Sequence, residues 1–251
     1  MAARRIYLVG EPFECFADGD RVTTPKRLSA DMEARGNGAD SGVELLPGQG
    51  LLEADYAELS QEVAHHCRPR DLRASSQWRE SVPATIGTYK DNVANVLVSD
   101  LRQSGDKEFT AELVIHPHNV MLIDRDNGAR HVAGMLEVEA CLQMAMAVTA
   151  QYLSPPGSEY AFVTSTTTIN FLAFLFPLPA TLTLLVNGMG DADGKYLELD
   201  LLTTISQSGR PTMTMEFRSR AFDVAVLRAT ERSQLDRALA FGPDETDDPS
   251  I

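Results

Sequence analysis

The stretch NGARHVAGMLEVEACLQMAMAV, residues 127–148, decides how the rest of the chain can be arranged. An Asn-Gly turn leads into residues with the periodicity of a helix. One apolar stripe at helical spacing consists of Met135, Val138, Leu142, Ala145 and Val148. The other faces are also small or apolar, and a helix that is apolar almost all round is usually buried. We therefore expect one long buried helix from about Ala133 to Tyr152.

Alternating apolar and polar residues predict antiparallel strands on both sides of this helix. These segments are residues 94–101, 109–116, 162–174, 180–188, 195–205 and 212–222. The run TSTTT, residues 164–168, is interpreted as β-branched strand filling rather than as the lining of a polar tunnel. Several antiparallel strands around one helix indicate an α+β layer arrangement. A strongly curved sheet wrapped around one long buried helix is the hotdog fold, which we predict here.

Residues 1–67 predict a small α/β appendage to this domain, of unknown role. Residues 23–36 have a Thr cap, an early Pro and a Gly stop, which are helix signals, and 53–67 favour a second helix. The loop LPGQG, residues 46–50, lacks the Gly-x-Gly-x-x-Gly pattern of dinucleotide sites and follows the wrong element. A packing or docking unit is therefore the favoured interpretation.

Three further boundaries follow from composition. Residues 68–88 mix charge, Ser, Pro and Gly without a period and read as a linker. The hotdog domain is expected over residues 89–228. Residues 229–251 are expected to be helical at first and then an acidic, disordered tail.

The net charge and the cysteines limit which classes of partner and which cellular compartment are expected for the protein. The 251 residues carry a formal net charge of -14, which would repel a nucleic acid backbone. Three cysteines without CxxC spacing suit a reducing cytoplasm. The most apolar window is shorter than the roughly 20 residues of a membrane span and holds two prolines, so no membrane partner is expected.

The buried helix and its opening turn carry the groups that could do chemistry. A carboxylate at Glu139 on an apolar helix suits general acid/base work, and His131 just before the helix titrates near neutrality. Backbone N–H groups around Gly134 lie at the helix N-terminus, where they favour a developing oxyanion. Glu137 lies about 200° around the helix from Glu139 and is expected to be a solvated or interface group. His116, His118 and Asp124 could form a metal site, but Pro117 breaks the geometry and no fourth ligand is evident. Neither a metal nor another cofactor is expected.

The segment HVAGMLEVEACLQMA, residues 131–145, resembles the motif of the AfsA-like (A-factor biosynthesis) hotdog family. Matching positions are His131, Val132, Gly134, Met135, Glu139, Ala140 and Gln143. The upstream family segments are matched by Tyr89-Lys90, Val96-Leu97 and Asp100, and the Pro-Leu-Pro turn follows at 177–179. The resemblance spans roughly residues 88–224. The family is distantly related to 3-hydroxyacyl-carrier-protein dehydratases.

The resemblance implies an enzyme of specialised metabolism that acts on a thioester of an acyl carrier protein or of coenzyme A. It implies catalytic roles for Glu139 and His131. Substrate-binding roles are implied for Gly134, Met135 and Gln143. Docking of an acidic acyl carrier would require a local basic patch, and the candidates for it, and for substrate binding, are Lys90, Arg125 and Arg130. Acyl transfer or condensation is the leading reaction, dehydration is the second, and a non-catalytic acyl-binding scaffold is a further alternative. Many members hold two hotdog units and this chain has one, so a homodimer is expected to complete the pocket.

Four positions depart from the family pattern, and one of them bears on the molecule that accepts the acyl group. Arg130 replaces an Asp, Ala133 a Pro and Tyr89 a His. Leu142 replaces an Arg three residues after the Glu. If that arginine grips a phosphate or a ketone oxygen, Leu142 cannot do so, because it has no donor.

Overall fold

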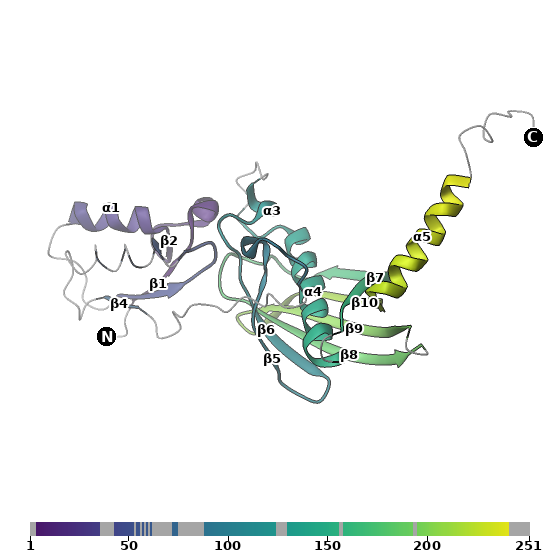
Figure 1. Ribbon diagram of the computed structural model, residues 1–251. Helices are drawn as coiled ribbons and strands as arrows, with labels where there is room; N and C mark the ends of the chain where they lie inside the picture. The colour runs from purple at the N-terminus through teal and green to yellow at the C-terminus, as the bar shows by residue number, and fades with distance from the viewer. Residues whose placement is uncertain are drawn as a thin grey trace, which may run out of the picture.

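The computed structural model describes residues 4–35, 43–52, 54–55, 57, 59, 61, 72–74, 88–123, 130–155, 158–192 and 195–240. These residues form two sheets, each with its own helix packed against it (Figure 1). The smaller, parallel sheet belongs to the N-terminal unit. The larger, antiparallel sheet belongs to the second part of the chain, together with the long helix that packs against it.

The antiparallel sheet has the strand order β5-β6-β8-β9-β10-β7. Its strands are β5 (Val98–Gln103), β6 (Glu108–Leu113), β7 (Tyr160–Phe171), β8 (Thr181–Asp191), β9 (Tyr196–Gln207) and β10 (Arg210–Asp223). The turn between β9 and β10 has positive φ at both Ser208 (52°) and Gly209 (73°). Two such residues favour a tight hairpin, because their twist matches that of the flanking strands.

The long helix α4 (Gly134–Val148) lies across this sheet and contacts all six strands (Figure 1). A π-helical turn, η4 (Thr149–Leu153), continues it. Ten of its fifteen residues are buried, on several faces, as the sequence predicts. The inward strand residues Leu199, Leu201, Ile205, Met213, Met215 and Phe217 are also buried. The predicted α+β hotdog fold is therefore confirmed.

Strand β7 is more exposed than its apolar residues suggest. Among the described strands it pairs with β10 alone, and residues 163–171 are exposed on both faces. The Thr-rich run 164–168 lies within this strand, as expected for β-branched residues, and does not line an enclosed tunnel. Exposed strand edges with apolar side chains invite pairing with another strand.

The N-terminal unit contains the parallel sheet β2-β1-β3-β4. Its elements are β1 (Arg4–Leu8), the 3₁₀ helix η1 (Glu11–Phe16), β2 (Val22–Thr23), α1 (Pro25–Arg35), β3 (Val43–Pro47) and β4 (Leu72–Ala74). A small second core joins β1, β3 and α1 through Ile6, Leu8, Leu28, Met32, Leu45 and Leu59. The predicted helix over 23–36 is confirmed as α1.

Two expectations about this region are only partly covered by the structure. Of the predicted helix over 53–67, the described residues 54, 55, 57, 59 and 61 are helical, and the others lie outside the described part of the chain. Within the predicted linker, Leu72–Ala74 pair with β3 as strand β4. Apart from these residues and Thr88, the linker also lies outside the described residues.

Two short helices lie in the loops of the hotdog domain. The 3₁₀ helix η3 (Val93–Asn95) precedes β5, and the helix α3 (Val120–Ile123) precedes α4. The helix α5 (Val224–Ala240) projects away from the sheet (Figure 1). Residues 241–251, the expected acidic tail, lie outside the described residues. None of the helices among the described residues combines the length and the apolar character of a membrane span.

Candidate active site around Glu139 and the start of helix α4

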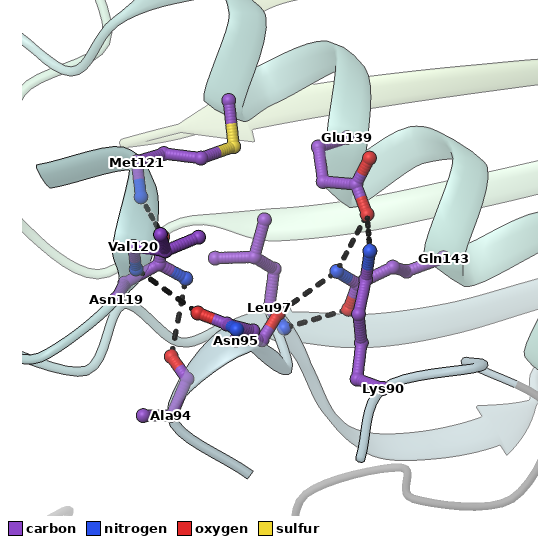
Figure 2. A network of polar contacts seen from close by, with 9 residues as sticks. All are labelled: Lys90, Ala94, Asn95, Leu97, Asn119, Val120, Met121, Glu139 and Gln143. Carbon is purple, nitrogen blue, oxygen red and sulfur yellow. Dashed lines mark hydrogen bonds and ion pairs between the residues drawn. The ribbon is translucent and has the colours of Figure 1, made fainter. Parts of the chain in front are cut away.

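Glu139 lies on the side of α4 that faces the loop before β5. Its Oε1 lies 2.7 Å from Lys90 Nζ and accepts a hydrogen bond of 3.0 Å from Gln143 Nε2 (Figure 2). The side chains of Lys90 and Glu139 keep 30% and 25% of their exposure, so the carboxylate is less withdrawn from water than predicted. Both contacts fall on Oε1, and Oε2 has no hydrogen-bond or ion-pair partner within the described part of the chain.

Gln143 holds this carboxylate from one helical turn further along α4. Its side chain is completely buried. Besides its bond to Glu139, Nε2 donates to the carbonyl of Asn95 (2.9 Å), and Oε1 accepts from the N–H of Leu97 (2.8 Å). Because both its nitrogen and its oxygen have hydrogen-bond partners, this buried amide is held in one orientation. Substrate binding by Gln143 stays a prediction, and in the structure its amide contacts Glu139 and anchors the loop before β5.

The same loop is tied to the short helix α3 by two asparagines (Figure 2). Asn95 Oδ1 accepts from the N–H of Val120 (3.0 Å), and Asn119 Nδ2 donates to the carbonyl of Ala94 (3.1 Å). Asn119 is itself buried. These bonds fix the loop from the side opposite to Gln143.

Tyr89 gives the loop an unusual backbone just before Lys90. Its φ is 54°, in the left-handed region that a bulky residue rarely adopts. Such conformations persist where the surrounding structure enforces them, and they concentrate at functional sites. The strained residue turns the chain so that Lys90 reaches Glu139.

The start of α4 offers free backbone donors. Ala133, at the N-cap, makes no side-chain cap. The first donors bonded to the helix backbone are the N–H groups of Leu136 and Glu137, both to the Ala133 carbonyl. Within the described part of the chain, the N–H groups of Gly134 and Met135 have no partner of this kind. Unpaired donors at a helix N-terminus favour an anionic oxygen.

An aromatic surface surrounds these donors. The imidazole of His131 packs on the ring of Phe174, with 4.7 Å between their centroids. A Cβ at Gly134 would lie 2.8 Å from the Phe171 ring, so glycine is needed for this close approach. Met135, Phe171 and Phe174 are 64%, 56% and 67% exposed. We call His131, Gly134, Met135, Phe171 and Phe174 the entrance surface.

The predicted site residues thus form two groups around α4. Lys90, Glu139 and Gln143 form the first, and His131, Gly134 and Met135 belong to the second. No hydrogen bond or ion pair among the described residues joins His131 to Glu139. Arg130 is exposed next to the entrance surface. Arg125, the other expected docking cation, lies outside the described residues.

Glu137 corrects the sequence interpretation. It was expected to be solvated or at an interface, but it is 3% exposed, and its Oε2 has no hydrogen-bond partner among the described residues. Burial raises the pKa of this carboxyl from 4.5 to about 7. Burial, with a contribution from Glu137, also raises the pKa of the Cys141 thiol, so Cys141 is unsuited to act as a nucleophile.

Sequence reasoning missed Phe171 and Phe174 as site residues. Both lie in a segment that reads as an apolar strand, and nothing in the local pattern says that the strand is at an edge. Gly134, at the start of the predicted helix, was the one local signal for such a contact, because a glycine often marks the close approach of another group.

A groove of about 450 Å³ lies elsewhere, on the face of the sheet away from α4. Its charged side chains are paired with one another, Arg218 with Asp200 (3.7 Å) and Arg220 with Glu198 (3.5 Å). All four side chains are well exposed. Exposed pairs of this kind are a common feature of solvated surfaces. The chemistry-bearing groups are therefore around α4.

The structure describes His116 and His118, two of the three metal ligands considered from the sequence. Their rings lie 5.4 Å apart, and the His118 N–H donates to His116 Nδ1. Among the described residues, no group of three or more His, Cys, Asp or Glu side chains could hold a metal ion. Asp124, the third ligand considered from the sequence, lies outside the described residues.

The model of the A-factor biosynthesis hotdog domain (AfsA) matches residues 82–223, more than half of the 251-residue chain. The chain belongs to the AfsA hotdog family. The match includes all seven predicted site residues of this AfsA domain and begins a few residues before the expected boundary at 89. None of the curated proteins compared with the chain is significantly similar to it.

Solved structures similar to this AfsA-family chain include a dehydratase and two thioesterases. The dehydratase heterocomplex ApeI:P from Xenorhabdus doucetiae has a TM-score of 0.46 and 11% identity, covering 60% of this chain and 98% of that one. A mutant thioesterase from Pseudomonas aeruginosa has a TM-score of 0.39 and 14% identity, covering 53% and 88%. A hypothetical thioesterase with coenzyme A from Streptococcus pneumoniae has a TM-score of 0.35 and 15% identity, covering 49% and 85%. The family assignment rests on the sequence match alone.

Proposed function

We propose that this AfsA-family protein is an enzyme that acts on an acyl thioester, carried by an acyl carrier protein or by coenzyme A, and transfers the acyl group to an acceptor. The observation that carries the proposal is the placement of Glu139. Its Oε1 is held by Lys90 and Gln143 while Oε2 remains available. A carboxylate with one fixed and one free oxygen is suited to moving a proton at a defined position.

The proposed mechanism uses both groups of residues around α4. The thioester carbonyl oxygen accepts hydrogen bonds from the N–H groups of Gly134 and Met135, which stabilise the oxyanion that forms. Glu139 takes the proton from the acceptor nucleophile as that nucleophile attacks the carbonyl carbon. The carbon–sulfur bond then breaks, and the leaving thiolate takes up the proton from Glu139. The His131 imidazole orients the thioester, and the apolar rings of the entrance surface contact the acyl chain.

Leu142 limits the acceptor. It is half-buried and packs against the hydrophobic core, and it stands where the family has an arginine. An acceptor phosphate would therefore find no guanidinium at this position. We propose an acceptor without a phosphate group. Dehydration is less favoured, because the upstream His that a dehydratase needs is replaced by Arg125.

A homodimer is the proposed functional unit, and a second copy would cover the entrance surface. Three observations support this. One edge of strand β7 has no strand partner among the described residues; Val163 and Ile169 on it are 41% and 37% exposed; and Phe171, at its end, adjoins Gly134. Exposed apolar side chains beside an open strand edge favour an interface.

The dimer is tested by placing a charge on the edge. Ile169→Lys is expected to convert the protein from a species of twice its 27.4 kDa mass to a monomer, because a lysine on an edge strand opposes strand pairing. Sedimentation velocity measures the mass. Thr181→Lys, at an exposed position on β8, is the control and should remain dimeric. A wild-type monomer, or an Ile169→Lys dimer, would contradict the proposal.

The reaction is tested with a panel of acyl thioesters on coenzyme A and on acyl carrier proteins, with and without alcohol acceptors, followed by mass spectrometry. Acyl transfer predicts thiol release together with an acylated acceptor. Loss of water from a hydroxyacyl thioester would instead assign dehydration, and thiol release without acceptor would assign hydrolysis. Binding without turnover of any thioester would assign the acyl-binding scaffold.

A further inference from the structure

The parallel sheet of the N-terminal unit has the topology of a ligand-binding α/β sheet. Strand β1 lies between β2 and β3, so the chain leaves β1 toward one side and later continues on the other. In open parallel sheets, ligands bind where this reversal occurs, outside the carboxyl ends of the two strands. Here that place is bounded by the loops that follow Leu8 and Pro47.

This crevice is closed by the protein itself. The loops bond to each other, from the Gly48 N–H to the Leu8 carbonyl (2.7 Å) and from the Gly10 N–H to the Gln49 carbonyl (2.9 Å). A Cβ at Gly10 would lie 1.5 Å from the Gly50 carbonyl oxygen. The two backbones therefore touch, and no volume remains between them for a ligand.

The loop after β3 instead reaches into the hotdog domain. The side chain of Gln49 is buried and replaces a strand partner for the end of β6. Its Nε2 donates to the Leu113 carbonyl (2.9 Å), and its Oε1 accepts from the Ile115 N–H (2.8 Å). The Gln49 N–H donates to the Pro177 carbonyl (3.0 Å), and the Gly50 N–H donates to the Ile115 carbonyl (2.8 Å).

The contact continues through apolar groups. Val9, Phe13 and Val22 of the N-terminal unit join the hydrophobic core of the hotdog domain. The ring of Phe16 stacks on that of Phe176, with 5.3 Å between their centroids and 18° between their planes. The N-terminal unit thus grips the segment 172–179 at both Phe176 and Pro177.

Segment 172–179 in turn fixes the start of α4. The Leu175 carbonyl accepts a bond of 2.7 Å from the Val132 N–H, and the Phe174 ring supports His131. Gln207 on β9 holds the same segment from the other side, since its Oε1 accepts from the Phe176 N–H (3.1 Å). A continuous path of contacts therefore runs from the N-terminal unit through 172–179 to the entrance surface.

We propose that the N-terminal unit is an intramolecular brace that binds segment 172–179 through the loops at the carboxyl ends of β1 and β3. In this brace, Gln49 is a positioning residue for His131 and the start of α4. This role does not depend on which reaction is catalysed, because the brace would fix the geometry of the entrance surface. The unit binds no nucleotide in this crevice, since the loops that would bind it contact the hotdog domain.

Hydrogen exchange of the wild-type protein in low urea tests the coupling without any substitution. The Gly50 amide reports opening of the contact, and the amides of Val132 and Phe176 report the state of the entrance. The brace predicts that Val132 and Phe176 lose protection in the same opening event as Gly50. Continued protection of Val132 and Phe176 after Gly50 has exchanged would overturn it.

A matched pair of variants then assigns the role to Gln49. Gln49→Met keeps the side-chain volume and removes the side-chain bonds. Exchange at Val132 and Phe176 should be about tenfold faster, which corresponds to the loss of one typical net hydrogen bond, and the His131 Cε1–H resonance should shift as its packing on Phe174 changes. Gln103→Met is the control, because Gln103 is exposed and also donates to a carbonyl, that of Asp106.

The variants distinguish a positioning role from a structural one. Faster exchange confined to residues 43–52, with an unchanged His131 resonance, would make Gln49 a local stabiliser and overturn its assignment. If Gln49→Met does not fold, the wild-type exchange experiment decides the proposal by itself. Neither readout requires turnover, so an inactive protein would contradict the proposed function and leave the brace standing.

Discussion

Replacing Glu139 by glutamine is expected to lower thioester turnover by about 10²–10⁴-fold, the range typical for loss of general acid/base catalysis. The amide has nearly the shape of the carboxylate, and its oxygen can still accept the bond from Gln143 Nε2. It cannot take a proton from the acceptor. The measurement is kcat with the best substrate of the thioester panel, together with binding of an unreactive thioether analogue by calorimetry.

The control for this variant is Glu216→Gln, which removes an exposed carboxylate on β10. It should change neither turnover nor binding. Glu139→Gln should bind the analogue within a few-fold of the wild-type affinity, because the N–H donors and the entrance surface are unchanged. Wild-type turnover in Glu139→Gln would remove Glu139 from the mechanism.

Replacing Glu137 by glutamine is expected to stabilise the protein at neutral and higher pH. Folding raises the pKa of this carboxyl from 4.5 to about 7. Between these values the native state binds more protons than the unfolded state, so the free energy of unfolding falls as pH rises. Above pH 7 the full cost of a buried charge is present, on the order of 3 kcal/mol at 1.36 kcal/mol per pKa unit. Below pH 4.5 this cost is absent.

The effect is measured by urea unfolding of the wild type and of Glu137→Gln at several pH values from 4.5 to 8. The gain in the free energy of unfolding should be small at the acid end, grow through the window up to about pH 7 and then level off. Glu216→Gln, an exposed carboxylate, should show no such gain. A gain that does not depend on pH, or a loss of stability at pH 8, would contradict the burial of an ionisable Glu137.

Helix α4 could be predicted because its signal is local. Small and apolar residues on all of its faces indicate burial in the protein interior, and the alternating segments around it predict the sheet that covers it. Glu139 could be singled out because it interrupts this apolar surface, and the family resemblance then favoured a functional role. Lys90 followed only from the resemblance, since nothing in the local sequence brings it to Glu139.

The error on Glu137 follows from the same helix. The 200° rotation correctly separates Glu137 from Glu139, but a helix buried on every side has no solvated face to receive the second carboxylate. Once the helix is taken as buried all round, both acids have to be inside or at an opening. One of them, Glu139, lies at the opening beside Lys90.

The other features that were not predicted depend on contacts between distant segments. The burial of a strand depends on its place in the sheet, and the sequence of β7 does not say that it is at the edge. Gln49 lies 64 residues from Leu113 and is brought to it by the tertiary fold. In the sequence, the loop 46–50 could be read only as lacking a nucleotide pattern.

The central claim, that a thioester carbonyl lies at the N-terminus of α4 within reach of Glu139, is tested most directly by a crystal structure with an acyl-pantetheine thioether bound. The predicted result is a carbonyl oxygen about 3 Å from the N–H groups of Gly134 and Met135, with the acyl chain against Phe171 or Phe174 and the acceptor side open to Glu139 Oε2. An analogue bound in the groove between Arg218 and Met189, or one that leaves the start of α4 untouched, would contradict it.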